Sequence, residues 1–577
     1  MKNNILKKSA LALLSVGMLA SCSEDYLNTE PITSIPATQV TSTVENAQMA
    51  VYGVCKGMFN QYQGATQGYN GEATIMMLNG EMPSQDYFYY QYAVGFPQYC
   101  NMEIFHETVS AYYTMFFPWA YSYTMINGAN VVIKGIDKAE GDEAKRKFVK
   151  AQALTLRAHG YTRLLQMYAP RWADSNNGEE NCLVLRIEDM ATGDSPLVSM
   201  NEIFKLIYDD MTTAISLMEE EGVKNIKRTF EWEPDYGVAC GVFARAALLK
   251  NDWETAATMA AKARKGYSLM SNEEYHSGFC AKNKEWMWNS SGDVKDQIYY
   301  WSHGVQFACN GYFAVNTDNG AGAANVLLLR QFPENDIRRQ LFLVEGNYYV
   351  NDRGQKTEVM SLENWYKKDN IIPQSISIDT KKGKYSRAAK EFLASMKPAT
   401  LPSTAPAAYV AAAGAESNPI FQYGAQIKFW VNDLPGIASV CFMRASEMLL
   451  IEAEARAEMG GANEATAQAL LNELNKERQP GYTCTKSGDE LIEEVRLYRR
   501  LELWGEGFNF FDFKRWNIAI DRKGWTAGDT TSGNAPATIV RRIEPQDGNQ
   551  WRYAIPRFET QYNLGINNEP ITSNNPK

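Results

Sequence analysis

One short stretch of the chain concentrates aromatic rings beside polar side chains. Five of the six positions from 87 to 92 are aromatic, and a carboxylate precedes them: Asp86, Tyr87, Phe88, Tyr89, Tyr90 and Tyr92. A short strand or turn cannot bury so many rings on one side, so we expect some of them to be exposed. An exposed ring stacks on the apolar face of a pyranose, while carboxylates and amides hydrogen-bond its hydroxyls. The run therefore predicts a carbohydrate-binding surface; the alternative is that these rings pack against the protein body.

A second aromatic group lies in the middle of the chain. It comprises Trp286, Trp288, Tyr299, Tyr300 and Trp301. In a strand, Trp286 and Trp288 would share one face, because alternate side chains point to the same side. The 32 tyrosines and 13 tryptophans of the chain suit sugar-binding surfaces and cores alike. We expect this group to supply further rings for a sugar, with burial again the alternative.

The sequence lacks the motifs of metal sites, of common catalytic nucleophiles and of nucleotide-binding loops. The histidines form no HExxH motif and no pair at metal-ligand spacing: His106, His159, His276 and His303. The chain has no GxSxG elbow, Walker loop or GxGxxG motif, although a Ser-His-Asp triad assembled by the fold stays open. We therefore expect no catalytic residue, no metal and no cofactor. The nine cysteines form no CxxC pair, and one or two disulfides stay open without an assignment.

Charges of both signs alternate with aromatic rings near the C-terminal end. The acidic members are Glu502, Glu506 and Asp512, and the basic members are Arg499, Arg500 and Arg515. Two such carboxylates can form the acid and base of a glycosidase. Opposite charges within reach keep carboxylates ionised, however, which disfavours the raised-pKa acid that such an enzyme needs. We expect instead ion pairs that tie a helix to the loop behind it.

The first segment has the order of a secretory signal. Three lysines precede an apolar stretch over 10–20, which at about eleven residues is too short to span a bilayer. The residues at the end of this stretch, Leu19-Ala20-Ser21-Cys22, look like a bacterial lipobox. That likeness implies a signal peptide over 1–21 and acylation of Cys22, for example by palmitate; the alternative is an ordinary signal peptide with a chance cysteine. The net charge of −10 argues against a nucleic-acid partner.

Helical spacing of apolar residues dominates much of the remaining chain. It predicts helices or helical hairpins over five ranges: 148–168, 200–218, 236–267, 443–478 and 490–504. Pro170 ends the first helix, and Ser199 or Asn201 caps the second. The third and fourth ranges are hairpins whose small residues allow close helix packing, as in tetratricopeptide-like repeats. They turn at Asn251-Asp252 and at Gly460-Gly461.

The helical ranges enclose irregular ones, which favours one body over several domains. We expect a mainly α chain in which 22–577 is a single body. Its helical scaffold would cover about 22–59, 100–270 and 436–577, and loop-rich, ligand-side insertions would cover about 60–99 and 271–435. Loops held by a rigid scaffold commonly carry binding sites.

These segments, in this order, resemble the SusD/RagB family of outer-membrane nutrient-uptake lipoproteins along nearly the whole mature chain. The matching motifs are Cys22-Ser23-Glu24-Asp25-Tyr26-Leu27, Leu156-Arg157-Ala158, Phe442-Met443-Arg444-Ala445-Ser446-Glu447, Glu452-Ala453-Glu454-Ala455, Glu506-Gly507, Phe511-Asp512-Phe513-Lys514-Arg515-Trp516 and Ile555-Pro556. Two positions depart from the family pattern. Ala169-Pro170-Arg171 stands where a Gly-Asp-Val-Pro type ending is usual, and Asn509 where an arginine is usual; they put local salt bridges in doubt.

The resemblance implies a SusD-like fold with four tetratricopeptide-like helix pairs and an irregular binding face to which the 81–92 region contributes. It also implies a non-catalytic glycan receptor for polysaccharide utilisation. Such a receptor is held on the outside of the cell outer membrane through the lipid on Cys22 and delivers oligosaccharide to a SusC-type TonB-dependent transporter. Two alternatives stay open: a peptide-uptake receptor of the RagB type and an anchored glycoside hydrolase.

Overall fold

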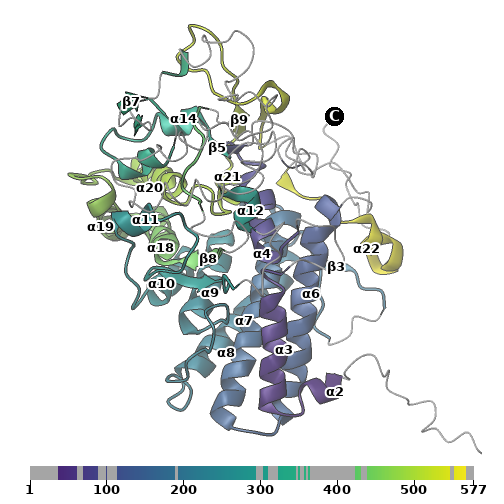
Figure 1. Cartoon of the computed structure of the whole chain (residues 1–577). Helices are drawn as coiled ribbons and strands as arrows, with labels where there is room; N and C mark the ends of the chain where they lie inside the picture. Colours follow the sequence, from purple (N-terminus) through teal and green to yellow (C-terminus); the bar gives the residue numbers. More distant parts are fainter. Residues whose placement is uncertain are drawn as a thin grey trace, which may run out of the picture.

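The computed structural model describes most of the chain (Figure 1). The described residues are 37–60, 69–88, 99, 113–188, 193–293, 303–308, 322–342, 344–345, 348–350, 356–358, 361–363, 423–430, 438–545 and 551–566. The expected signal peptide lies outside them. So do seven of the candidate residues: Cys22, Tyr89, Tyr90, Tyr92, Tyr299, Tyr300 and Trp301.

The N-terminal helices begin where side chains cap them. They are α2 (Ala37–Val40), α3 (Val44–Lys56), α6 (Tyr113–Gly135), α7 (Glu143–Tyr168) and α8 (Met200–Glu219). Asp142 accepts a hydrogen bond from the Lys145 amide and so caps α7. Ser199 caps α8 and forms a capping box with Glu202. The helices expected over 148–168 and 200–218 are therefore confirmed.

The later helices form the two expected hairpins and a final helix. They are α9 (Tyr236–Leu249), α10 (Trp253–Ala263), α18 (Ala445–Met459), α19 (Glu464–Arg478) and α20 (Gly488–Glu502). Asn251 turns the first hairpin with a φ of 58°, and Asp252 then caps α10. Gly460 ends α18 with a φ of 65°, a conformation that glycine adopts without strain. Both turns fall where the sequence predicts them.

The long helices stack as consecutive pairs in the described part of the chain. The pairs are α3–α6, α7–α8, α9–α10 and α18–α19. Both helices of each pair pack mainly on the first helix of the next pair, and α20 closes the array against α18 and α19. Figure 1 shows α3, α6, α7 and α8 side by side, with the later pairs beside them. The fold class is mainly α with tetratricopeptide-like hairpins, as the sequence predicts.

The other elements are short and lie around the long helices (Figure 1). The helical turns are α4 (Gly71–Thr74), η2 (Ile75–Glu81), α11 (Asn272–Tyr275), α12 (His303–Phe307), α14 (Val326–Leu329), η6 (Ile337–Leu341), α21 (Asn509–Trp516) and α22 (Arg557–Tyr562). The strands are β1 (Tyr87–Phe88), β2 (Asn181–Val184), β3 (Leu197–Ser199), β4 (Trp286–Asn289), β5 (Ala323–Ala324), β6 (Tyr348–Val350), β7 (Lys356–Glu358), β8 (Cys441–Arg444), β9 (Ile520–Arg522) and β10 (Arg541–Ile543). They form antiparallel two-stranded ribbons: β1–β5, β2–β3, β4–β8, β6–β7 and β9–β10.

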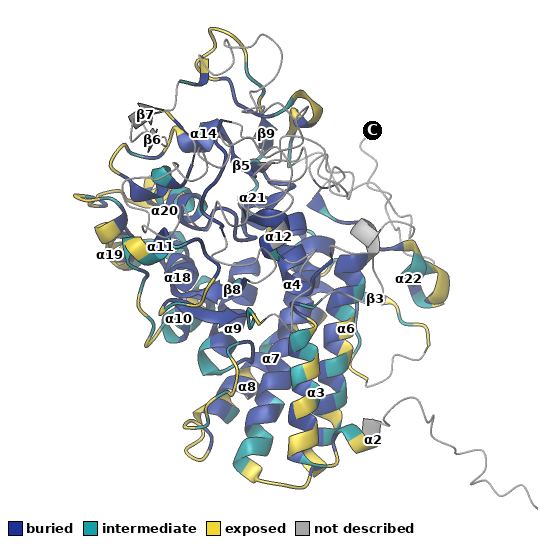
Figure 2. Cartoon of the chain, viewed as in Figure 1, coloured by how far each residue is buried: buried dark blue, intermediate teal, exposed yellow. Residues whose placement is uncertain are grey.

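The segment 71–84 corrects one expectation from the sequence. It falls in a range expected to be a loop-rich insertion, yet α4 and η2 make it helical, and every residue in it is buried. Figure 2 shows α4 and α21 in dark blue, whereas α3 exposes its outer side. The reason is a close backbone approach: a Cβ on Gly80 would lie 2.2 Å from the carbonyl oxygen of Gly507.

That approach predicts a strong effect of one added methyl group. Gly80→Ala is expected to lower the free energy of unfolding by about 2 to 3 kcal/mol, because the methyl group overpacks against backbone that cannot move aside easily. Gly53→Ala is the matched control, since a Cβ there meets nothing within 4 Å and alanine stabilises a helix by roughly 0.5–1 kcal/mol over glycine. Urea unfolding of both variants checks this, and equal stabilities would contradict the close contact.

Two further expectations concern membranes and disulfides. Of the helices that the structure describes, none combines the length and the apolar character needed to cross a membrane. The described cysteines are free thiols: Cys55, Cys182, Cys240, Cys280, Cys441 and Cys484. The disulfides left open by the sequence therefore do not involve these six residues.

Candidate functional site

Asp86 closes the buried 71–87 segment and is not available to a ligand. Its side chain is fully buried, with both oxygens bound by the Arg500 guanidinium at 2.7 and 2.9 Å. Asn509 donates a further hydrogen bond to it at 2.9 Å. The expectation that Asp86 binds sugar hydroxyls is wrong for this arrangement, because the side chain is buried and its oxygens are held by Arg500 of α20 and Asn509 of α21.

Tyr87 is also part of the core. Its side chain is 1% exposed and its ring lies on Trp504, with ring centroids 5.1 Å apart. In β1 it pairs with Ala324 of β5, and a Cβ on Gly322 would collide with its hydroxyl. The expected exposure of this ring is therefore wrong, because a partner strand from a distant part of the chain covers it.

Trp286 and Trp288 lie in β4 and are buried as well. They are 1% and 0% exposed. The indole N–H of Trp288 donates to the Trp232 carbonyl at 2.7 Å, so its polar atom is satisfied inside the protein. The β4–β8 ribbon lies against α9, and the rings of His159 and Phe442 pack on Trp288 while that of Phe279 packs on Trp286. These two rings are core residues, and their expected role in stacking on a sugar is wrong.

The buried rings nevertheless hold the ends of the remaining candidate segments. Residue 89 follows directly on β1, which pairs with β5. Ala323 of β5 also bridges to Ala425, and the neighbouring Gln426 side chain donates to the Phe307 carbonyl of α12 at 3.0 Å. One described end of each of three segments therefore lies at or near this ribbon: Phe88 before 89–98, α12 after 294–302 and Gly322 after 309–321. Tyr89, Tyr90, Tyr92, Tyr299, Tyr300 and Trp301 belong to the first two, and their own positions lie outside the described residues.

Sequence reasoning missed the residues that make this junction. Ala323, Ala324 and Ala425 are small and wholly buried, and nothing in their own neighbourhood of the sequence signals a strand pair. Their small size is a weak signal, since small residues often mark places where another part of the chain approaches closely.

A buried ion network lies beneath the junction. Arg444 is 1% exposed, and its guanidinium lies 2.7 Å from Glu285, 2.8 Å from Glu502 and 2.6 Å from Glu506. Lys428 adds a second cation at 2.5 Å from Glu506. These contacts join α20 and the loop after it to β8, a partner that the alternating charges near the C-terminal end do not predict.

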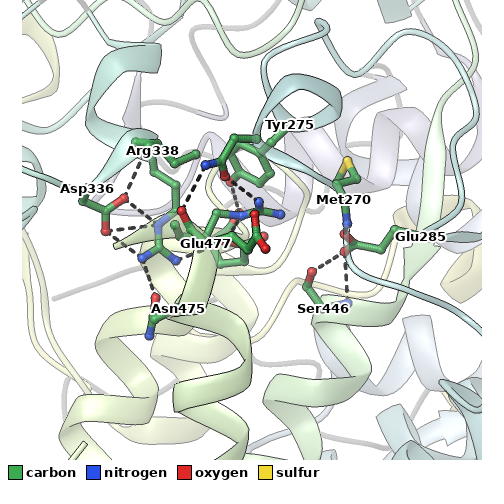
Figure 3. A network of polar contacts seen from close by, with 12 residues as sticks. Met270, Tyr275, Glu285, Asp336, Arg338, Ser446, Asn475 and Glu477 are labelled. Atoms are coloured by element: carbon green, nitrogen blue, oxygen red, sulfur yellow. Dashed lines mark hydrogen bonds and ion pairs between the residues drawn. The ribbon is translucent and has the colours of Figure 1, made fainter. Parts of the chain in front are cut away.

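A second arginine extends the network toward α19. Figure 3 shows Asp336 and Asn475 converging on Arg338, whose Nη2 lies 2.6 and 2.7 Å from their oxygens. On the other side of the same view, Glu285 accepts hydrogen bonds from the amides of Ser446 at 3.1 Å and Met270 at 2.6 Å. Every carboxylate of the network thus has charged or amide donors around it.

The electrostatics of the network oppose acid catalysis. Burial disfavours the charged form of Glu502, but Arg444, Arg478 and Arg338 outweigh it and lower its pKa to about 2. Asp512 is held by Arg499 at 2.6 Å and by Arg515 at 2.9 Å. A general acid needs a carboxyl group that keeps its proton. Glu502 is therefore suited to holding the fold together through ion pairs and not to acid catalysis. Among the described residues, no cluster of histidine, cysteine and carboxylate side chains could hold a metal ion.

Two family models match the chain. Residues 436–573 match the SusD family, and residues 39–242 match a model described as starch-binding associating with outer membrane. Together they cover more than half of the chain. This chain belongs to the SusD-like family. No protein with a curated description matches it.

Solved structures share the fold. A SusD-like carbohydrate binding protein from Bacteroides vulgatus is 20% identical, with 93% of this chain and 98% of that chain covered and a TM-score of 0.67. A SusD superfamily protein from Bacteroides thetaiotaomicron is 18% identical, with 91% and 99% covered and a TM-score of 0.65. One from Bacteroides fragilis is 16% identical, with 92% and 100% covered and a TM-score of 0.61. At these identities the likeness concerns the fold.

Proposed function

We propose that this protein is a glycan-binding lipoprotein of the outer cell surface that captures oligosaccharide and delivers it to a SusC-type TonB-dependent transporter. Membership of the SusD-like family and the outer-membrane, starch-binding description of one matching model support this role. One structural observation carries it: a small ribbon on a rigid helical array gathers the described ends of aromatic-rich segments. Binding surfaces are commonly built from segments held in this way.

The proposed receptor binds without chemistry on its ligand. Glu502, Glu506 and Asp512 are each held by arginine or lysine, and the arginines around Glu502 lower its pKa to about 2. A purified mature chain is therefore expected to release no reducing ends from a glycan that it binds. Steady release that disappears when one carboxylate is replaced by its amide would favour the anchored glycoside hydrolase instead.

The aromatic run gives the direct test of glycan binding. Replacing Tyr89 and Tyr90 together by alanine is expected to weaken binding roughly tenfold or more, because each stacked ring contributes on the order of 1 kcal/mol and 1.4 kcal/mol is one decade. Titration calorimetry measures this, first with maltoheptaose and then with other oligosaccharides. The melting temperature should change little.

Tyr562→Ala is the control for that experiment, since its ring is 84% exposed and lies in α22. A large melting shift of the double variant with unchanged affinity would place these two rings in the core. The proposed site would then pass to Tyr299, Tyr300 and Trp301. Binding of peptides, but of no glycan, in parallel array experiments would favour the peptide-uptake receptor.

The lipid anchor is proposed from the Leu19-Ala20-Ser21-Cys22 sequence. Cys22→Ala is expected to remove the protein from the outer-membrane fraction, because the acyl chains then have no thiol to attach to and the transporter contact alone is not a stable anchor. Membrane fractionation and surface labelling in a strain without the transporter measure this. A Cys22→Ala protein that still labels at the surface of that strain would contradict the anchor.

A further inference from the structure

A cavity of about 490 Å³ opens on the helical array. Phe148 of α7, Met218 of α8 and Val223 after it line its apolar part, and residues 226–237 and 262–267 surround them. This volume falls in the range of small-molecule sites. Of the candidates that the structure describes, neither Asp86 and Tyr87 nor Trp286 and Trp288 line it.

The side chains around the cavity carry an excess of positive charge. Six basic and two acidic residues line it: Lys224, Lys227, Arg228, Lys262, Lys265 and Lys282, with Glu231 and Asp235. Four of the cations have carboxylate partners, in the pairs Lys224–Glu221, Arg228–Asp235, Lys262–Glu219 and Lys282–Glu231. Lys227 and Lys265 have no ion-pair partner among the described residues. Two positive charges are therefore uncompensated here, in a chain whose net charge is −10.

An exposed aromatic face lies at the edge of the same cavity. Phe230 is 44% exposed, and its ring stacks on the buried Trp232 with centroids 4.5 Å apart and planes 9° from parallel. Tyr52 supports both rings edge-on, at 5.4 and 5.0 Å. One face of the phenyl ring is thus fixed from behind while part of the ring stays open to solvent.

The loop that carries these groups is held rigidly. The carboxylate of Glu233, which is 1% exposed, accepts hydrogen bonds from the amides of Thr229 at 3.0 Å and Phe230 at 2.7 Å. Its other oxygen accepts from the Gln152 side chain of α7 at 3.0 Å. A ligand that binds beside Phe230 would therefore lose little free energy in ordering the loop.

We propose that this cavity binds the acidic unit of a saccharide, with the sugar ring on Phe230 and the anionic group, a carboxylate or a sulfate ester, on Lys227 and Lys265. A saturated ring carrying C–H groups on one face suits the open side of an aromatic ring. The anion meets the two uncompensated ammonium groups, whose attraction acts over about 8 to 10 Å in physiological salt. Tyr236 and Tyr267 also line the cavity; the Tyr236 hydroxyl donates to Glu219 at 2.7 Å and can accept from a sugar hydroxyl.

Titration calorimetry on the full mature chain tests this with trigalacturonate and its methyl ester, which keeps the rings but removes the charges. Trigalacturonate is expected to bind more tightly than the ester, and more weakly as salt rises from about 20 to about 200 mM. Lys227→Gln with Lys265→Gln should weaken it roughly tenfold or more, and Phe230→Ala about fivefold. The charge-matched control is Lys138→Gln with Lys476→Gln, two exposed lysines outside the cavity.

Several outcomes would overturn the proposal. They are equal binding of acid and ester, unchanged binding in the Lys227 and Lys265 double variant, and equal weakening in the control. Tetraglutamate bound as tightly as trigalacturonate would make the cavity a peptide or general anion site rather than a saccharide site. The Tyr89 and Tyr90 double variant should keep its affinity for trigalacturonate, so failure of this site and failure of the proposed function are seen separately.

Discussion

Replacing Arg444 by methionine is expected to lower the free energy of unfolding by about 3 to 5 kcal/mol, the usual cost of removing one partner from a buried ion pair. Methionine keeps most of the volume but leaves Glu285, Glu502 and Glu506 without the cation that all three share. Lys428 reaches only Glu506, so it cannot replace the lost charge at the other two. Guanidinium unfolding followed by fluorescence and far-UV circular dichroism measures the change.

Arg542→Met is the matched control for this prediction. Arg542 also contacts two carboxylates, those of Asp521 and Glu544, but its side chain is 54% exposed. Surface pairs are screened by water, so a loss within about 1 kcal/mol is expected. If Arg444→Met cost no more than this control, the network would not hold β8 to the loop after α20. If Arg444→Met does not fold, Arg444→Lys, which keeps a charge but loses the planar fork, should fold with part of the loss.

Glu81→Gln is expected to remove a pH dependence from the stability of the protein. Burial is the main cause that raises the pKa of the Glu81 carboxyl from 4.5 to about 8, and the charge of Asp86 adds to it. The amides of Gly507 and Phe508 donate to one oxygen at 2.7 and 3.2 Å and only partly oppose the shift. The folded protein thus keeps a proton that the unfolded chain releases.

Whether stability rises or falls with pH follows from which state of the protein, folded or unfolded, binds the proton. Below about pH 4.5 both states hold it, and as the pH rises toward 8 only the folded state does, so the stabilisation from the neutral acid is progressively lost. Between pH 5 and 7 the wild type should lose about 2 to 3 kcal/mol more than Glu81→Gln, at 1.36 kcal/mol per pH unit for one proton. Urea unfolding at several pH values measures this difference.

Glu493→Gln serves as the control, because Glu493 is 63% exposed and pairs only with Arg496 on its own helix. Its stability curve should run parallel to that of the wild type across the same pH range. If the stability curve of Glu81→Gln also ran parallel to that of the wild type, Glu81 would be ionised in the folded protein.

The candidate binding residues show where local reasoning from sequence fails. The density of rings over 87–92 predicts exposure only if the segment packs on one side. Tyr87 instead lies between Trp504 and β5, and Asp86 meets Arg500 more than 400 residues along the chain. Trp286 and Trp288 are buried for the same reason, because β4 pairs with the distant strand β8, whose Phe442 packs on Trp288. A partner so distant in sequence leaves no trace in the local pattern.

The charged segment near the C-terminal end shows the opposite. Alternating signs within a short stretch predict ion pairs, and Arg499 and Arg515 do hold Asp512. Both are close to Asp512 in sequence, so the pattern contains the information. The convergence of Arg444 and Arg338 on Glu502 was beyond that pattern, because it joins three separate parts of the chain.

The pattern of residues alone predicted the helices over 148–168, 200–218 and 490–504 and both helical hairpins, in their order along the chain. Helix formation and capping depend on residues within four or five positions of one another, as at Ser199 with Glu202 and at Asn251 with Asp252. The family could also be identified from the sequence, since its motifs keep their order along the chain.

Which rings and charges are available to a ligand depends on tertiary packing, which the local sequence pattern does not show. Exposure depends on what packs against a side chain, and here the packing partners come from distant segments, as for Tyr87 under β5 and Phe230 on Trp232 and Tyr52. Whether a lysine is compensated is decided in the same way, since Lys262 meets Glu219 of another helix while Lys227 and Lys265 meet no carboxylate among the described residues. Contacts of this kind are set by the fold as a whole, because burial and Coulomb interactions act through space and not along the chain.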